Sequence, residues 1–382
     1  MMLLAWAVLL VLGAVAFVMR LNQAMKRTPP EGLKHMAKLL TRESIRSINA
    51  KVKSQGVDFR KNRPPRLNRR YIIVGGSGFV GTQMALDLLD DGTSAAAIRL
   101  IDIRAPVREE FANGKASQVS FVQADITSET STTAAFETPW PTSVASLPLT
   151  VFHTAAVIRP YERHEVFYAR SSRVNVVGTA NSLSAARRAG ASVFIYTSSA
   201  HVAGSPVGWF FPLWWRQPRN FAQVLTEEDF FKPLRQASGF PSNYARSKAE
   251  AERLVCGADS DSFRTGCIRP GSGVYGDKDD LIIGRMLRLG RVPTFSAAWV
   301  QNWVHVRNVS AGHVLLERQL LGDNADKVRA RPFVVTDGEA IRFEDMYTVL
   351  DETGTYDISF TPVATVDRLL FEDERRMAME SE

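Results

Sequence analysis

The stretch YIIVGGSGFVG, residues 71–81, decides the fold of this chain. Its first four residues form an apolar run typical of a buried strand. Glycines follow at once, and the next segment, TQMALDLLDDG, has helical periodicity and a glycine stop. The pattern predicts a strand, a glycine turn and a helix. The missing side chains of Gly75, Gly78 and Gly81 would let the backbone turn sharply and approach a pyrophosphate at the start of the helix.

A second strand, IRLID at residues 98–102, supports a dinucleotide site. It places Asp102 twenty-one residues after Gly81, where a carboxylate can bind the ribose hydroxyls of an adenosine. Asp102 would repel a 2′-phosphate, which favours NAD, while Arg104 leaves NADP open. A phosphate-binding P-loop is excluded because Thr82 stands where that loop needs a lysine.

Two further strands, in FVQADI and VFHTAAV, would end at the same edge of the sheet. In doubly wound folds the adenine binds at this edge, so the polar and small residues that follow the strands are candidate contacts. The predicted cofactor contacts up to this point are Gly75, Ser77, Gly78, Phe79, Val80, Gly81, Asp102, Asp125, Ile126 and Ala155.

The candidate catalytic group follows the next strand, SVFIYTSSAHV, which ends in Ser198 and Ser199. The helical run PSNYARSKAEAERLV carries Tyr244 and Lys248, whose spacing of four puts both side chains on one helix face. A phenol with a pKa of about 10 is a poor base at neutral pH, and lowering it by ~3 units needs about 4 kcal/mol of phenolate stabilisation. Lys248 and an oxidised nicotinamide would supply it. A lone Y-x-x-x-K is usually an exposed helix face, but its place after the glycine turn, the acidic strand and Ser199 predicts a catalytic group.

The chain resembles the extended short-chain dehydrogenase/reductases, and most closely the 3β-hydroxysteroid dehydrogenase and sterol-4α-carboxylate 3-dehydrogenase group, over roughly residues 71 to 350. The motifs that carry the resemblance are VGGSGFVG, LIDI, ADI, FHTAA, RVNVVGTANSLSAAR, FIYTSSAHVAG, NYARSKAEAE, IRPGSGVYG, WVHVRNV and FVVTDGEAIRFEDMY. The resemblance implies that Tyr244 is the acid/base and that Ser199 hydrogen-bonds the substrate oxygen. It implies that Lys248 holds the cofactor ribose and lowers the Tyr244 pKa.

The resemblance also implies that Pro270 and Gly271 pass near the nicotinamide and that Asn175 lies on a helix behind the site. The sequence departs from the family pattern at Arg307, where relatives usually carry aspartate, and at Val74, where threonine is common. Relatives generally continue through a longer substrate-binding region, whereas this chain ends at DERRMAMESE. Substrate specificity is therefore less firmly implied than the reaction.

Residues 1–19 contain no charged side chain, and at about 1.5 Å per residue they reach roughly the 30 Å of a hydrocarbon core. They predict a single-pass transmembrane helix. A cleaved signal peptide, with Ala14-Val15-Ala16 at its cleavage site, is the alternative. Because basic residues follow directly, the positive-inside rule places the catalytic domain in the cytosol. A membrane of the endoplasmic reticulum is the expected location.

The net charge of +7 belongs to one segment, because residues 20–70 hold fifteen Lys and Arg against three acids. Apolar residues between 33 and 52 recur at roughly helical spacing, so this segment is either a helix on anionic headgroups or a solvated linker. Nucleic-acid binding is not expected, because the basic excess is juxtamembrane. No metal site is expected, because the six histidines are scattered. Two cysteines, Cys256 and Cys267, indicate a reducing compartment.

The stretch VGWFFPLWWRQP, residues 207–218, holds five large aromatic residues and lies between Ser199 and Tyr244. Tryptophan is favoured at membrane interfaces, so one interpretation is an interfacial entry loop for a lipid-like substrate. The alternative is a packed Ω-loop or part of a sterol pocket without membrane contact.

We therefore expect an α/β fold: a Rossmann-type doubly wound parallel sheet with a small C-terminal substrate-binding subdomain, preceded by the transmembrane helix. The expected parts are the anchor at 1–19, a basic juxtamembrane linker at 20–70, the NAD(P)-binding domain at 71–270 with an aromatic insert at 205–240, and the substrate-binding subdomain and tail at 271–382.

The expected activity is NAD(P)-dependent oxidation of the 3β-hydroxyl of a sterol- or terpenoid-like substrate, or the reverse ketone reduction. Decarboxylation would follow if the substrate carries a 4α-carboxylate. A nucleotide-sugar epimerase or flavonoid-type ketone reductase is the alternative within the fold, and the apolar anchor and aromatic loop count against it. A membrane-tethered cofactor-sensing pseudoenzyme is the third hypothesis, and the presence of Ser199, Tyr244 and Lys248 counts against it. A homodimer is left open.

Overall fold

The computed structural model describes most of the chain. The described residues are 2–36, 40–61, 63–212, 214–277, 280, 282–289, 291–294, 297–354 and 359–362. The tail of the predicted C-terminal subdomain, residues 363–382, therefore lies outside the described residues, as does Leu213 of the aromatic stretch.

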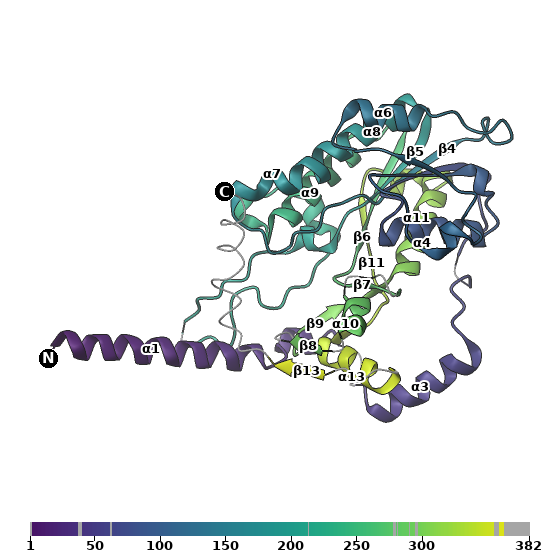
Figure 1. Cartoon of the computed structure of the whole chain (residues 1–382). Coiled ribbons are helices and arrows are strands. Elements are labelled where there is room, and N and C mark those ends of the chain that lie inside the picture. The colour runs from purple at the N-terminus through teal and green to yellow at the C-terminus, as the bar shows by residue number, and fades with distance from the viewer. Residues whose placement is uncertain are drawn as a thin grey trace.

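A seven-stranded parallel sheet forms the centre of the protein, with the strand order β11-β6-β5-β4-β1-β2-β3 (Figure 1). Its strands are β1 (Arg70–Val74), β2 (Ile98–Asp102), β3 (Ser120–Gln123), β4 (Leu149–His153), β5 (Ala191–Thr197), β6 (Arg264–Pro270) and β11 (Pro332–Val335). The order reverses beside β1, which is the arrangement of a doubly wound sheet. The predicted fold class is confirmed.

Both faces of the sheet are covered, which explains why residues 71–74 of the first strand are buried and mostly apolar. Ile72 and Val74 of β1 pack in one core with helices α6 (Glu129–Glu137), α8 (Thr179–Arg188) and α9 (Asn243–Gly257). Tyr71 and Ile73 pack in the other core with α4 (Phe79–Asp90) and α11 (Val306–Leu321). Successive side chains of β1 thus enter opposite layers, as strand geometry requires.

The register brings the ends of the strands to one edge. Val74 lies beside His153, which lies beside Tyr196, and Tyr196 lies beside Cys267. Because all these strands are parallel, the residues that follow each of them emerge at the same carboxyl edge of the sheet. The sequence motifs that follow β1, β4, β5 and β6 are therefore neighbours in space.

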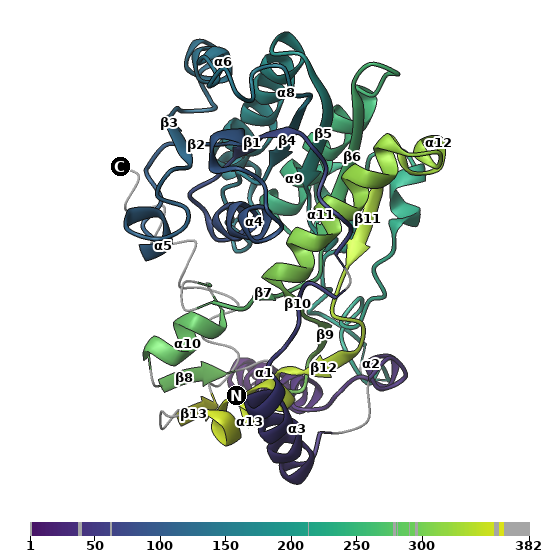
Figure 2. The same ribbon diagram turned by 90° about the vertical axis from the view of Figure 1, so that its right-hand side faces the viewer.

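A smaller unit lies below the sheet in Figure 2. Its core contains Ile283, Trp303, Met346 and Leu350. Its elements are β7 (Val274–Tyr275), α10 (Ile283–Leu289), β8 (Arg291–Thr294), β9 (Val300–Asn302), β10 (Val304–His305), β12 (Ala340–Arg342), α13 (Phe343–Thr353) and β13 (Ser359–Pro362). The chain leaves the sheet when β6 ends at Pro270 and later returns to it through α11 and β11, and β11 pairs in parallel with β6.

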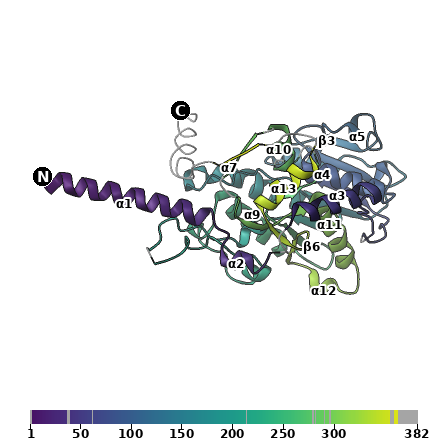
Figure 3. The ribbon, with the colours of Figure 1, turned by 90° about the horizontal axis from the view of Figure 1, so that it is seen from below.

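The remaining helices are short or N-terminal. They are α1 (Met2–Met25), α2 (Pro30–Leu33), α3 (Arg42–Gln55), α5 (Glu109–Ala112), α7 (Tyr168–Ser172) and α12 (Ala325–Val328), with a π-helix at Arg173–Gly178. Helix α1 projects from the body of the protein (Figures 1 and 3). It is long and apolar enough to cross a membrane, residues 2–16 are exposed, and burial begins at Phe17. The helix extends beyond the predicted 1–19, to Met25.

The basic segment after α1 contains helices but also binds the body of the protein. Arg42 and Arg46 of α3 pair with Glu352 of α13. Ile45 is buried, whereas Ile48 and Val52 are exposed. Part of this segment is therefore docked on the C-terminal unit, which neither the headgroup-bound helix nor the solvated linker predicted.

Between Gly56 and Arg69 the described residues form no helix or strand, yet they follow the surface of the protein. Arg63 lies 3.2 Å from Asp87 and 2.5 Å from Asp91, at the end of α4. Arg307, the departure from the family pattern, lies 3.6 Å from Asp87, and its guanidinium sits 5.1 Å from the centre of the Phe59 ring. Part of the basic charge of this segment is thus neutralised by acidic residues at the end of α4.

Glu317 of α11 lies in a buried polar network, and its pKa makes the stability of the protein depend on pH. Thr150 donates to Glu317 at 2.5 Å and Arg69 lies 3.4 Å from it, while Tyr71 lies at 3.5 Å. Burial raises the pKa of Glu317 to about 7, against the hydrogen bond from Thr150 and the charge of Arg69.

A raised carboxyl pKa means that the folded protein binds more protons than the unfolded chain, so this contribution to stability is present at low pH and lost as the pH rises towards 7. Compared with Glu317→Gln, the wild-type free energy of unfolding should fall by roughly 1.4 kcal/mol per pH unit between about 4.5 and 7. Urea unfolding across this range measures the difference, and parallel pH profiles for the two proteins would contradict it.

Candidate active site

The glycine turn is as tight as the sequence predicts. Gly75 has a φ of +78°, and a Cβ there would lie 2.4 Å from the backbone nitrogen of Ala155, just beyond β4. A Cβ on Gly81 would lie 2.3 Å from the carbonyl oxygen of Gly75. Because both contacts are with backbone, only glycine lets β1, α4 and the end of β4 meet here. Helix α4 begins at Phe79, directly after this turn.

Asp102 lies beside the turn at the end of β2. The backbone N–H of Ser77 donates to one of its carboxylate oxygens at 3.1 Å, and that of Ile103 donates to the other at 2.8 Å. The Ser77 hydroxyl is buried and has no hydrogen-bond partner among the described residues. Because buried polar atoms normally have a partner, an orphan donor in a glycine-lined turn at a helix start fits a bound pyrophosphate. The residues present therefore fit a dinucleotide.

The other predicted cofactor residues surround the same edge. Asp125 is exposed after β3 and accepts a hydrogen bond from the N–H of Thr127 at 2.8 Å. The side chain of Ile126 is buried against Gly178, so only its backbone is available to a ligand. The residues whose positions complete this edge are Phe79 and Val80 in the first turn of α4, Ala155 after β4, and Pro270 at the end of β6.

The candidate catalytic residues lie at the start of α9 and the end of β5. Ser242 caps α9 by accepting a hydrogen bond from the N–H of Ala245 at 3.2 Å, so the first helical turn begins with Tyr244 in place. Lys248, one turn later, is buried and donates to the carbonyl of Thr197 at 2.5 Å. Ser199 follows β5; its hydroxyl accepts a hydrogen bond from the N–H of His201 at 3.2 Å and lies close enough to Tyr244 to affect the pKa of that phenol. The structure thus brings the predicted triad together.

Burial controls the protonation of this group. Burial raises the pKa of Tyr244, and the interaction of its phenol with the Ser199 side chain lowers it in part. Burial lowers the pKa of Lys248 to about 7, against the opposing effect of the charge of Glu252. The lysine does not contribute to the Tyr244 shift in the protein alone. The predicted lowering of the Tyr244 pKa by Lys248 thus stays a prediction for the complex with cofactor.

Asn175, predicted to lie behind the site, is linked to it through a serine that the sequence reasoning missed. Its amide donates to the Ser247 hydroxyl at 2.9 Å, and this hydroxyl donates to the carbonyl of Tyr244 at 2.8 Å. The same amide bonds both backbone groups of Val157, at 2.8 and 3.0 Å. Asn175 lies in a π-helical segment, a distortion that often marks functional sites. Asn175 thus connects α9 to the segment after β4.

Arg269 forms a buried ion cluster that the sequence did not predict. Arg269 is the penultimate residue of strand β6, just before Pro270. Its guanidinium lies 2.5 Å from Glu252 of α9 and 2.6 Å from Asp229 of the aromatic insert. Arg269 and Glu252 are both buried. The one available signal was an arginine inside the apolar strand TGCIRP, because a buried charge needs a partner. Its partners could not be identified from their distance along the chain.

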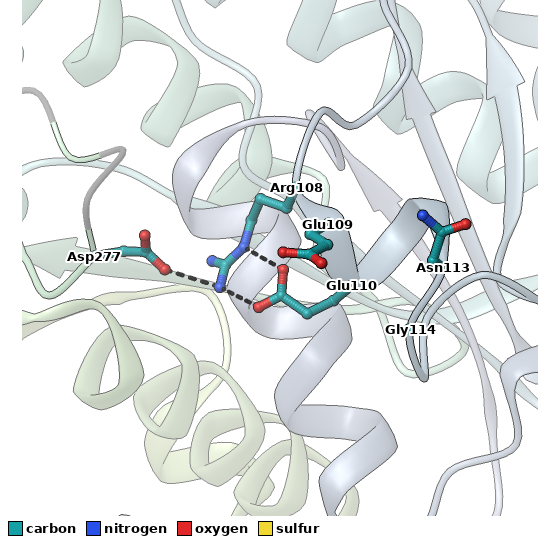
Figure 4. Close-up of a pocket in the computed structure, with 6 residues that line it drawn as sticks. All are labelled: Arg108, Glu109, Glu110, Asn113, Gly114 and Asp277. Carbon is teal, nitrogen blue, oxygen red and sulfur yellow. Dashed lines mark hydrogen bonds and ion pairs between the residues drawn. The ribbon is translucent and has the colours of Figure 1, made fainter.

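A polar hollow lies apart from these residues (Figure 4). Its volume is about 390 Å³, and it is lined by Arg108, Glu109, Glu110, Asn113, Gly114 and Asp277. Arg108 points to two carboxylates, 3.0 Å from Glu110 and 2.8 Å from Asp277. None of these residues is a predicted site residue, and the charge of Arg108 is already paired. The hollow marks where the segment after β2 meets the loop after β7.

The glycine turn can be tested against a glycine of the same backbone conformation. Gly75 and Gly190 have φ values of +78° and +73°, but a Cβ on Gly190 would meet no atom within 4 Å. We expect Gly190→Ala to cost about 1 kcal/mol of stability and to leave dinucleotide affinity unchanged. Gly75→Ala should cost more and weaken dinucleotide binding at least about tenfold, because the turn must open. Calorimetric titration with NAD measures this, and equal affinities for the two variants would contradict it.

Comparison with solved structures agrees with the fold. Solved structures with the same fold include MoeE5 in complex with UDP-glucuronic acid and NAD, with a TM-score of 0.55 and 19% identity over 77% of this chain and 85% of that one. Another is a double mutant of DesIV, a dTDP-glucose 4,6-dehydratase from Streptomyces venezuelae with NAD bound. Its TM-score is 0.56, with 21% identity over 77% of this chain and 84% of that one.

The proteins most similar to this chain in sequence include steroid and sterol dehydrogenases. The chain is 29% identical over 300 residues to a 3 beta-hydroxysteroid dehydrogenase/Delta 5→4-isomerase of Mycobacterium tuberculosis, covering 75% of this chain and 70% of the relative. It is 28% identical over 282 residues to the human decarboxylating sterol-4-alpha-carboxylate 3-dehydrogenase, covering 72% and 64%. The family model for the 3-beta hydroxysteroid dehydrogenase/isomerase family matches residues 72–214 and 215–363. The chain therefore belongs to the 3-beta hydroxysteroid dehydrogenase/isomerase family.

Proposed function

We propose that this protein is an NAD(P)-dependent oxidoreductase that oxidises the 3β-hydroxyl of a sterol or a similar terpenoid, or reduces the corresponding ketone. The observation that carries the proposal is the meeting of Tyr244, Ser199 and Lys248 at the sheet edge that also holds the glycine turn. The family and the sterol-processing relatives support a hydroxyl group as the reacting centre.

Each residue has a defined role in this reaction. Ser199 and Tyr244 hold the substrate oxygen, and Tyr244 as phenolate takes the hydroxyl proton during oxidation. Lys248 holds the cofactor ribose and, when charged, favours the phenolate. Asn175 and Ser247 fix the backbone at Tyr244. NAD, when bound, supplies the hydride acceptor.

NAD is the proposed cofactor, with NADP as the alternative. The glycine turn and the Ser77 hydroxyl would hold the pyrophosphate, and Asp102 would hold the adenosine ribose. A carboxylate at this position repels a 2′-phosphate. Arg108, a half-buried cation in the segment after β2, is paired with two carboxylates and offers no open phosphate site.

If the substrate carries a 4α-carboxylate, oxidation of its 3β-hydroxyl gives a β-keto acid. Such an acid can lose carbon dioxide without further help from the protein. The name of the human relative supports this outcome, and that of the mycobacterial relative supports isomerisation of a double bond. One structural neighbour was solved in complex with UDP-glucuronic acid, and the other is a dTDP-glucose 4,6-dehydratase. They are only 19% and 21% identical to this chain, so they support the fold alone.

We also propose that α1 is a single-pass anchor in the membrane of the endoplasmic reticulum, in contact with lipid, and that the catalytic domain faces the cytosol. The exposure of residues 2–16 and the basic residues after them support this orientation. The division into anchor, linker, cofactor domain and substrate-binding subdomain, and a homodimer, stay predictions.

The reaction can be tested without prior choice of substrate. Purified full-length protein is incubated with NAD and a sterol extract, and mass spectrometry identifies any compound that loses two hydrogens, or two hydrogens and carbon dioxide. A 3β-hydroxysterol converted in this way supports the proposal. Turnover of nucleotide sugars in place of sterols would overturn it, and binding of NAD without turnover of either class would support the pseudoenzyme.

A further inference from the structure

The aromatic loop, residues 207–218, contacts helix α1. The ring of Phe210 stacks on that of Phe17, with 5.5 Å between centroids and 13° between planes, and Phe211 lies 6.1 Å from the same ring. The guanidinium of Arg20 sits 5.1 Å from the centre of the Phe211 ring and donates to the carbonyl of Trp215. The loop therefore meets α1 at the turn where the exposed part of the helix ends.

A buried cluster fixes this contact to the body of the protein. Leu21, Ala24, Met25 and Phe211 form its core. Trp209, Phe221, Trp299 and Phe17 pack around that core. Trp299 lies just before β9, so the cluster joins α1, the aromatic loop and the C-terminal unit. The packed-loop interpretation is therefore right for Phe211 and Trp209.

The tip of the loop has the opposite character. Phe210 and Trp214 are each 81% exposed and Trp215 is 42% exposed. Isolated exposed apolar residues are common, but these continue the exposed apolar surface of residues 2–16 through the stacked ring of Phe17. Aromatic rings next to an arginine at the end of an apolar helix are the composition of a membrane interface.

We propose that the tip of the aromatic loop inserts into the same bilayer leaflet as the end of α1, with Phe210 and Trp214 in contact with lipid. This rests on the proposed anchor. The loop lies in the connection from β5, which ends at Thr197 just before Ser199, to α9, which begins at Asn243 and carries Tyr244. An inserted loop holds the active-site side of the protein against the membrane, so a substrate dissolved in the bilayer reaches the site without crossing bulk water.

A second exposed apolar surface is consistent with this orientation. Ile158, Tyr161 and Val166 are 54%, 47% and 76% exposed, in the segment between β4 and α7. Figures 1 and 3 both show α7 at the end of the body from which α1 projects. Helix α5 lies at the opposite end of the body in Figure 3. The segment after the carboxyl end of β4 and the anchor therefore lie at the same end of the body.

The insertion is tested by spin labels on the full-length chain in vesicles of neutral and anionic phospholipid. Single cysteines replace Phe210, Trp214, Trp6 within α1, or Val107 near α5, which is 86% exposed. The native Cys256 and Cys267 are buried, so they should not react. The measurement is the nitroxide accessibility to oxygen, which concentrates in lipid, relative to a water-soluble nickel chelate.

We expect the oxygen-to-nickel ratio at positions 210 and 214 to exceed that at position 107 at least about threefold and to approach that at position 6. Ratios at 210 and 214 equal to the ratio at 107 would overturn the insertion, whether or not position 6 is in lipid. A water-exposed label at position 6 with lipid-exposed labels at 210 and 214 would overturn the anchor and retain the loop. Because no turnover is measured, failure of the proposed reaction is distinguished from failure of this inference.

Discussion

Replacing Tyr244 with phenylalanine should lower kcat by about 10²–10⁴-fold while leaving NAD affinity nearly unchanged. In the proposed reaction the phenol removes the substrate proton, and its loss leaves the glycine turn intact. Burial raises the pKa of Tyr244, so the phenolate is scarce at neutral pH. The rate of oxidation by the wild type should therefore rise with pH, and this rise should disappear in the variant. Steady-state kinetics from pH 6 to 10 measure both effects.

Tyr168→Phe is the matched control. Tyr168 lies on α7, beside α9, and its hydroxyl donates to Glu250 of α9, outside the proposed reaction. This variant should keep the wild-type pH profile and a kcat within a few-fold of the wild type. Near-normal turnover by Tyr244→Phe would refute the assignment of the acid/base. Equal losses of kcat in the two variants would show that the removal of any tyrosine hydroxyl at α9 lowers turnover, whatever its place in the reaction.

Arg269→Ala should lower the free energy of unfolding by about 3–5 kcal/mol. Arg269 donates to both carboxylate oxygens of Glu252, at 2.9 and 2.5 Å, and to Asp229 at 2.6 Å. Removal of the guanidinium leaves the Glu252 carboxylate buried without its partner, which costs more than the pair itself contributes. Chemical denaturation measures the loss.

Two variants delimit this effect. Arg188→Ala removes an arginine that pairs with Glu129 on the surface, and it should cost less than about 1 kcal/mol. Removing Glu252 together with Arg269 should recover part of the loss, because no carboxylate then lacks a partner in the core. If Arg269→Ala lowers the free energy of unfolding no more than Arg188→Ala does, the ion cluster does not stabilise the packing of β6, α9 and the insert.

The sequence by itself determined the elements whose constraints are local. The apolar run before Gly75 predicted a buried strand, the glycines predicted a turn that only they can form, and the spacing of Tyr244 and Lys248 predicted one helix face. Each of these rests on backbone sterics or on a side-chain period within a few residues. They appear in the structure as β1, the turn before α4, and the first two turns of α9.

Only the tertiary structure decided which distant segments meet. The pairing of Arg269 with Glu252 and Asp229, the docking of Arg63 on α4, the return of β11 to β6 and the packing of the aromatic loop on Phe17 join residues far apart in the chain. A charge or an aromatic ring needs a partner for physical reasons, but many partners of the right kind exist along the sequence. The choice among them depends on the path of the whole chain, because burial and distance are set only when all the layers have packed.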